Sequence, residues 1–151
     1  MLSFSHTIIL IPAHNEQATV GTIVRRVRQR WDCPVAVIDD CSTDATGLAA
    51  RDAGAIVLPL SLQLGAWGAI QTGLRYALRQ GYRTAITLDA DGQHEPEEIG
   101  KLLYPLAAGV ADVIIGAFPE RASRARQIAW AYFRGITGLK LEDITSGFRA
   151  Y

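Results

Sequence analysis

Short apolar runs alternate with longer amphipathic stretches along this chain. Five runs rich in β-branched residues are predicted to be strands, at 6–11, 35–38, 55–60, 84–88 and 112–116. Between them apolar residues recur at helical spacing, which predicts helices at 18–27, from 42 or 43 to 53, at 65–80, from 95 onward and at 121–138. Solidly apolar strands separated by helices indicate an α/β fold, with a mainly parallel sheet covered on both faces.

Single residues are expected to mark where these elements begin and end. Pro12 closes the first strand, and Asn15 and Glu16 are helix-start residues. Gly54 and Gly81 are expected to end two of the helices. The last stretch, 143–151, shows no periodicity and is predicted to be irregular.

Composition limits the class of protein. A chain of 151 residues with zero formal net charge fits one domain and gives no long-range attraction to nucleic acid. Cys33 and Cys41 are not spaced like a zinc site or a redox pair, so we expect reduced thiols and a cytoplasmic setting. No apolar run approaches the roughly 20 residues that span a bilayer, and Met1 to His6 lacks a signal-peptide pattern.

Three of the predicted strands end in polar or acidic clusters, at 12–16, 39–44 and 89–93. In a parallel sheet these clusters gather at the carboxyl edge, where open α/β sheets bind ligands. Asp89 and Asp91 stand two residues apart, so both carboxylates can face one small volume. Mg²⁺ or Mn²⁺ bound to a diphosphate would neutralise such a pair. The alternative is that both aspartates only form a turn.

Four motifs occur in order along the chain: IPAHNE at 11–16, VIDDCSTD at 37–44, LDADGQH at 88–94 and TSGFRAY at 145–151. With these motifs the chain resembles glycosyltransferase family 2, whose members have the GT-A fold. It is most similar there to the dolichyl- and polyprenyl-phosphate sugar transferases. A Rossmann dehydrogenase is disfavoured because no G-x-G-x-x-G follows the first strand.

The resemblance implies roles for particular positions. A nucleotide-sugar donor would be held in its nucleoside part by Pro12, His14 and Glu16. Its base and ribose would meet Ile38, Asp39 and Asp40, with Ala90 also in the donor site. Asp89 and Asp91 would be the catalytic pair, and with Gln93 they would hold Mg²⁺ or Mn²⁺, which would stabilise charge on the leaving diphosphate.

The chain departs from the family pattern in three places. Its glycine loop, 65–68, has no cation where Gly-Lys-Gly is frequent, and Ala117-Phe118 replaces a frequent Ser-Arg. A donor-phosphate contact is therefore absent or comes from Arg121 or Arg124. The third departure is the end at Tyr151, where relatives continue, so the single catalytic domain 1–151 is expected to be short at its C-terminus.

For several of these residues a purely structural role remains an alternative to ligand binding. His14 and Gln93 fit plain loop positions, and Asp40 and Asp44 fit turn or helix caps. The arginines of 121–134 fit a solvated helix face, and packing is favoured over base stacking for Trp67.

The expected reaction is inverting transfer of a hexose from a GDP- or UDP-sugar. Polyprenyl phosphate is the favoured acceptor, because its phosphate oxygen is already an anion and needs no general base. With no membrane span expected, docking would be peripheral at the inner membrane face, or a homodimer or membrane partner would complete the acceptor site. The rivals are a nucleotide-sugar binding module without turnover and, less favoured, a nucleotidyltransferase.

Overall fold

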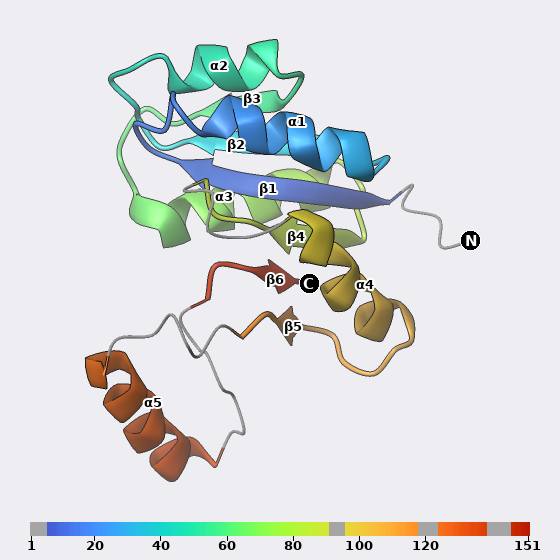
Figure 1. Cartoon of the computed structure of the whole chain (residues 1–151), viewed down its shortest axis with the longest axis vertical. Coiled ribbons are helices and arrows are strands. Elements are labelled where there is room, and N and C mark those ends of the chain that lie inside the picture. The colour runs from blue at the N-terminus through green and yellow to red at the C-terminus, as the bar shows by residue number, and fades with distance from the viewer. Residues whose placement is uncertain (1–5, 91–95, 118–123, 139–145) are drawn as a thin grey trace.

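The computed structural model describes residues 6–90, 96–117, 124–138 and 146–151. Its strands and helices alternate along most of the chain (Figure 1). The strands are β1 (Thr7–Ala13), β2 (Val35–Asp39), β3 (Ile56–Pro59), β4 (Thr84–Thr87), β5 (Ile114–Ile115) and β6 (Arg149–Ala150). The helices are α1 (Val20–Arg30), α2 (Thr46–Asp52), α3 (Gly65–Arg79), the 3₁₀ turn η1 (Pro96–Glu98), α4 (Ile99–Ala107) and α5 (Arg124–Thr137).

The strands form one sheet in the order β3-β2-β1-β4-β6-β5. The first four of these are parallel neighbours, as predicted. β6 runs antiparallel to both β4 and β5, and it pairs Arg149 with Thr87 on one side and with Ile115 on the other. The prediction that 143–151 is irregular is therefore wrong for its last residues. A two-residue strand has no periodicity to read, and its partner β4 lies some sixty residues earlier in the chain.

Helices cover both faces of the sheet, which confirms the predicted α/β architecture. Figure 1 shows α1 and α2 together on one side and α3 on the other. Alternate residues of β1 divide between two cores: Ile9 and Ile11 pack with α1 and α4, whereas Ile8 and Leu10 pack with α3. This division is what a strand with a period of two produces when both faces are buried.

Several strands and helices begin or end at other residues than predicted. β1 continues through Pro12 to Ala13, because pairing with β4 ends at Leu10 while pairing with β2 continues to Ala13. The Ile9 N–H points to β2, so position 12 faces the side where β4 has already ended and no ladder bond is lost. Gly54 and Gly81 have φ of 89° and 81°, the left-handed geometry expected where helices end.

The helix-start predictions at Asn15, Glu16, Ser42 and Thr43 are wrong. α1 begins at Val20, and α2 begins at Thr46 after Ala45. These polar residues instead join the loop after β1 to the loop after β2. β5 is also shorter than the predicted 112–116. Among the described residues no helix is long and apolar enough to cross a bilayer.

Candidate active site at the carboxyl edge of the sheet

The ends of β1 and β2 lie side by side at the carboxyl edge. Ala13, the last residue of β1, pairs with Asp39, the last residue of β2, and the Asp40 N–H donates to the Ala13 carbonyl at 2.8 Å. The His14 ring closes the same junction, since its Nδ1 lies 2.8 Å from the Asp40 carbonyl oxygen. The first two polar clusters therefore meet, as the sequence predicted.

Asn15 fastens the loop after β1 to the loop after β2. Its φ of 56° is left-handed, a conformation that asparagine tolerates better than most residues. In that position its N–H donates to Ser42 Oγ at 3.0 Å, and its side-chain Oδ1 accepts from the Thr43 N–H at 2.8 Å. The Glu16 N–H in turn donates to Thr46 Oγ1 at 2.7 Å. The side chains of Asn15 and Ser42, which the sequence suggested as helix-start residues, therefore bond to the opposite loop.

Asp44 supports the second loop. Its carboxylate accepts from the Thr46 N–H at 2.9 Å and from the Thr46 hydroxyl, and the Gln17 N–H also donates to it. These contacts, the Thr46 hydroxyl first, hold the pKa of Asp44 below its ordinary value against a smaller opposing effect of burial. Of the turn and cap alternatives for Asp44, the turn role fits this geometry, because the N-cap residue of α2 is Ala45.

Asp39 and Asp40 are neighbours in sequence but do different things. The half-buried Asp39 accepts from the Ser42 N–H at 3.0 Å and lies close against Gly47, where an added Cβ would approach its Oδ2 to 2.7 Å. Asp40 is only 3% exposed, and its two oxygens accept from the N–H groups of Leu64 and Gly65 at 2.7 and 2.8 Å. Asp40 thus holds the start of α3 against the end of β2.

The third polar cluster begins at Asp89, two residues beyond β4. Leu88 before it and Ala90 after it are buried, which fixes the chain on both sides of the partly exposed carboxylate. The Thr87 hydroxyl donates to the Gly147 carbonyl at 2.6 Å, and the Gly147 backbone lies directly against the Asp89 carboxylate. The segment before β6 therefore forms one wall of the place where Asp89 sits.

A second contact joins that segment to α3. The Arg149 guanidinium lies 4.4 Å from the centroid of the Trp67 ring, and its Nε donates to the Ser146 carbonyl at 2.7 Å. Trp67 lies in the first turn of α3 and is 52% exposed. Its ring is therefore not part of the core, and it contacts the Arg149 guanidinium.

The structure gives a mixed account of the predicted site residues. His14, Glu16, Asp39, Asp40 and Asp89 all lie at this edge. Pro12, Ile38 and Ala90 lie there too, but their side chains are buried, so they would shape the site from beneath. Asp91, Gln93 and Arg121 fall outside the described residues, and Arg124 is the first residue of α5.

Two of the three predicted metal ligands, Asp91 and Gln93, lie outside the described residues. Within 6–90, 96–117, 124–138 and 146–151, no three His, Cys, Asp or Glu side chains are grouped to hold a metal ion. Of the predicted ligands only Asp89 is described. Its carboxylate oxygen, in a cluster predicted to continue with Asp91, is of the type that Mg²⁺ and Mn²⁺ prefer.

Sequence reasoning missed several residues that build this edge. Ser42, Thr43 and Thr46 fasten the two loops to each other. Gly147 contacts Asp89, and Arg149 contacts Trp67. The TSGFRAY motif at 145–151 contains Gly147 and Arg149, but nothing in the motif shows which residues they touch.

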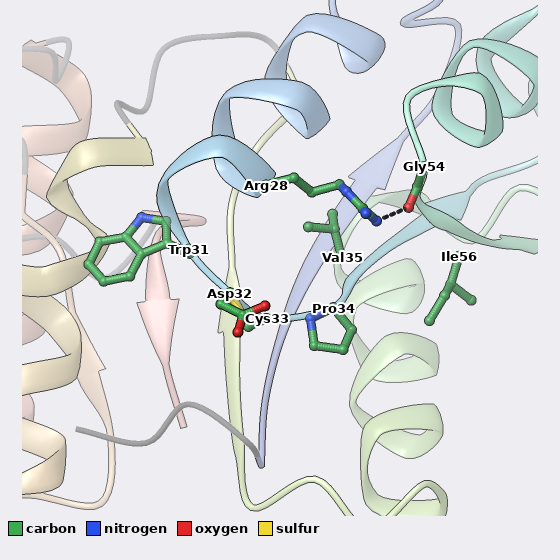
Figure 2. A pocket seen from close by; sticks show the side chains of 8 residues that line it. All are labelled: Arg28, Trp31, Asp32, Cys33, Pro34, Val35, Gly54 and Ile56. Atoms are coloured by element: carbon green, nitrogen blue, oxygen red, sulfur yellow. Dashed lines mark hydrogen bonds between the residues drawn. The ribbon is translucent and has the colours of Figure 1, made fainter. Parts of the chain in front are cut away.

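A cavity of about 300 Å³ lies at the opposite edge of the sheet (Figure 2). It is lined by the first residues of β2 and β3, Val35 and Ile56, and by the end of α1. Arg28 reaches across it to donate to the Gly54 carbonyl. Burial, and secondarily Asp32, raises the pKa of the Cys33 thiol here to about 11. Among the predicted site residues that the structure describes, none lines this cavity.

Known structures share the fold. Glucosyl-3-phosphoglycerate synthase from Mycobacterium tuberculosis, solved with Mn²⁺, UDP-glucose and phosphoglyceric acid, matches with a TM-score of 0.77. The match covers 95% of this chain and 55% of that one at 23% identity. The same enzyme solved with Mg²⁺ and UDP gives a TM-score of 0.73 at 23% identity. At this identity the likeness concerns the fold.

Sequence relatives are nearer. Polyprenol monophosphomannose synthase of Mycolicibacterium smegmatis is 35% identical over 96% of this chain and 61% of its own length. Undecaprenyl-phosphate mannosyltransferase of Micrococcus luteus is 35% identical over 95% of this chain and 65% of its own. The chain thus spans somewhat under two thirds of these relatives. The sequence model described as Glycosyl transferase family 2 matches residues 8–149. The chain therefore belongs to glycosyl transferase family 2.

Proposed function

We propose that this chain is the donor-binding part of a metal-dependent inverting glycosyltransferase that moves a hexose from a GDP- or UDP-sugar to a polyprenyl phosphate. The observation that carries the proposal is the convergence of the β1, β2 and β4 ends on one edge, with the Asp89 carboxylate fixed against Gly147. The names of the two mannosyl-transferring relatives support the polyprenyl acceptor.

The nucleoside would lie over the cross-linked loops after β1 and β2. His14 and Glu16 come from the first loop and Asp39 ends the second strand, so their side chains would line one side of the donor. Carboxylates are suitable acceptors for ribose hydroxyls and ring N–H groups. Asp40 would act indirectly, because its two oxygens already hold the start of α3. Pro12, Ile38 and Ala90 would form the floor.

The diphosphate would lie near Asp89. Asp89, with Asp91 and Gln93 beyond the described residues, would hold Mg²⁺ or Mn²⁺. A bound divalent cation supplies Lewis-acid stabilisation of the charge that develops on the leaving nucleoside diphosphate. What the chain itself does is position that carboxylate: the Thr87 hydroxyl fixes the Gly147 carbonyl, and Gly147 allows close approach because it has no Cβ. Arg121 or Arg124 would contribute a further phosphate contact.

A lipid phosphate acceptor fits the chemistry and one surface of the protein. Direct displacement by an anionic phosphate oxygen inverts the anomeric carbon and requires no general base. α5 exposes large apolar side chains at Tyr132, Phe133 and Ile136. A helix face of this kind is suited to the headgroup region of a membrane, so we propose peripheral docking there.

Turnover tests this proposal directly. Purified protein with Mn²⁺ and undecaprenyl phosphate would be incubated with radiolabelled GDP-mannose or UDP-glucose, followed by lipid extraction. We expect labelled lipid of inverted anomeric configuration, and its loss in Asp89→Asn. Asp52→Asn, an exposed carboxylate at the end of α2, serves as the matched control. Donor binding without labelled lipid would instead support a binding module, and pyrophosphate release from a nucleoside triphosphate would indicate a nucleotidyltransferase.

A further inference from the structure

Arg149 is a cation in a largely acidic setting. The described carboxylates at this edge belong to Glu16, Asp39, Asp40, Asp44 and Asp89. The Gly65–Gly68 segment that opens α3 contains no lysine or arginine. Arg149 reaches that segment from β6 and lies over the Trp67 ring at 4.4 Å. A positive charge therefore stands beside the start of α3 although the segment itself has none.

The position of Arg149 is built rather than incidental. Phe148 and Ala150 on either side belong to the core next to α1 and α4, so alternation along β6 directs Arg149 to the α3 face. There the Trp67 ring supports the flat side of the guanidinium, and the Ser146 carbonyl accepts from Nε. Two different contacts thus fix both the place and the tilt of the group.

The same short segment touches the carboxylate assigned to the metal. Gly147, two residues before Arg149, packs against Asp89. Arg149 itself pairs with Thr87, two residues before Asp89. A diphosphate bound at Asp89 would consequently have this guanidinium as a close neighbour. Guanidinium forks match phosphate oxygens in geometry, and a fork oriented in advance loses less side-chain freedom on binding.

We propose that Arg149, oriented by Trp67, is a phosphate-binding residue of this site. This inference rests on the proposed function for the identity of the ligand. The shared chemistry is a phosphate oxygen, supplied either by the β-phosphate of the nucleotide or by the phosphate of the lipid acceptor. Trp67 is a positioning residue: it acts through the guanidinium that it supports.

Calorimetry with matched nucleotides tests the proposal. UDP and UMP, or GDP and GMP, would be titrated with Mn²⁺ into wild type, Arg149→Ala and Arg149→Lys. If the β-phosphate is the partner, Arg149→Ala weakens the diphosphate roughly ten- to a hundred-fold and the monophosphate less than about two-fold. Arg149→Lys recovers only part, because it keeps the charge without the fork. Arg79→Ala, an exposed arginine at the far end of α3, is the control for loss of one positive charge.

A second experiment tests the lipid acceptor by measuring the KM for undecaprenyl phosphate. If the lipid phosphate is the partner, Arg149→Ala leaves nucleotide affinity unchanged and raises the KM for undecaprenyl phosphate about ten-fold. Trp67→Ala should shift the same quantity as Arg149→Ala, whichever it is, by a smaller factor, and Trp67→Phe should restore most of it. A lysine at the exposed Ala66, introduced in the Arg149→Ala background, should recover part of the lost affinity by returning a cation to the start of α3.

The outcomes separate this inference from the proposed function. If wild type binds nucleotide but Arg149→Ala matches Arg79→Ala in both arms, the inference is overturned and the function stands. If wild type binds no nucleotide, the function falls, and inorganic pyrophosphate with Mn²⁺ becomes the probe. Pyrophosphate binding that is lost in Arg149→Ala supports the inference, and no binding by wild type overturns it as well.

Discussion

Gly147 and Asp89 lie so close together that a side chain at position 147 would collide with the Asp89 carboxylate. An added Cβ there would come within 2.5 Å of Asp89 Oδ2 and 2.6 Å of Asp89 Cγ, and nearer still to Oδ1. Atoms in real structures do not approach in this way, so the carboxylate or the backbone would have to move. The Ser-Gly-Phe-Arg segment is thus physically coupled to the aspartate that the proposed function assigns to the metal.

Gly147→Ala should therefore damage the site more than the fold. The added methyl displaces the Asp89 carboxylate, and changing a group that positions a metal ligand typically costs about 10–100-fold in metal affinity. We expect at least about ten-fold weaker Mn²⁺-dependent nucleotide binding, measured by calorimetry. Gly135→Ala in α5, where an added Cβ meets nothing within 4 Å, should bind like wild type. Equal binding by both variants would show that Asp89 is not held in this way.

Asp40→Ala should destabilise the protein. The substitution removes the buried carboxylate that accepts from the N–H groups of Leu64 and Gly65, and hydrogen bonds to charged groups contribute about 1.5–3 kcal/mol each. We expect a loss of about 3 kcal/mol in the free energy of unfolding, measured in urea, and a smaller loss for Asp40→Asn. Asp52→Ala should stay within about 0.5 kcal/mol of wild type. An Asp40→Ala variant as stable as this control would contradict the anchoring role.

Asp44 should give the stability a component that depends on acid pH. Its pKa is lowered in the folded protein, chiefly by the Thr46 hydroxyl, so the unfolded chain takes up a proton more readily than the folded one. The resulting stabilisation is complete above the ordinary aspartate pKa of about 3.9 and is lost as the pH falls through the lowered value. Urea unfolding from pH 6 to pH 2.5 should show wild type and Asp44→Asn converging at the acid end. A difference that is constant with pH would refute this.

The two cysteines should react with alkylating agents at very different rates. Burial raises the pKa of Cys33 to about 11, so little thiolate forms near pH 8, whereas Cys41 is exposed and follows Asp40 at the candidate site. Mass spectrometry after brief iodoacetamide treatment should find Cys41 modified first. UDP or GDP with Mn²⁺ should slow the modification of Cys41 and leave that of Cys33 unchanged. Protection of Cys33 instead would move the binding site to the opposite edge of the sheet.

Much of the fold was predictable because its signals are local. The runs that became β1, β2, β3 and β4 are mostly apolar, and each is separated from the next by a helix. The acidic residues that follow β2 and β4 therefore fell at one edge by the rules of parallel sheets. β6 was not predictable in this way, because its two residues are placed by pairing with a strand that is distant in sequence.

The finer structure of the site depended on contacts that no local pattern encodes. Asn15, Ser42 and Thr43 have the composition of helix caps, and only the approach of two loops decides that they bond to each other. In the same way Asp39 and Asp40 look equivalent in sequence. Asp39 remains partly exposed at the edge, whereas both oxygens of Asp40 accept hydrogen bonds from the start of α3. Trp67 gave no sign that its partner would be Arg149.

The proposed function requires this edge to bind a nucleoside diphosphate through a divalent metal held at Asp89 and Asp91. The most direct measurement is calorimetric titration of the purified protein with GDP and with UDP, each with and without Mn²⁺, beside Asp89→Asn and Asp91→Ala. We predict that one nucleotide binds only when Mn²⁺ is present and that both variants lose this binding while remaining folded. Absence of binding to either nucleotide by the folded wild-type protein, or binding that persists without metal and in both variants, would contradict the account.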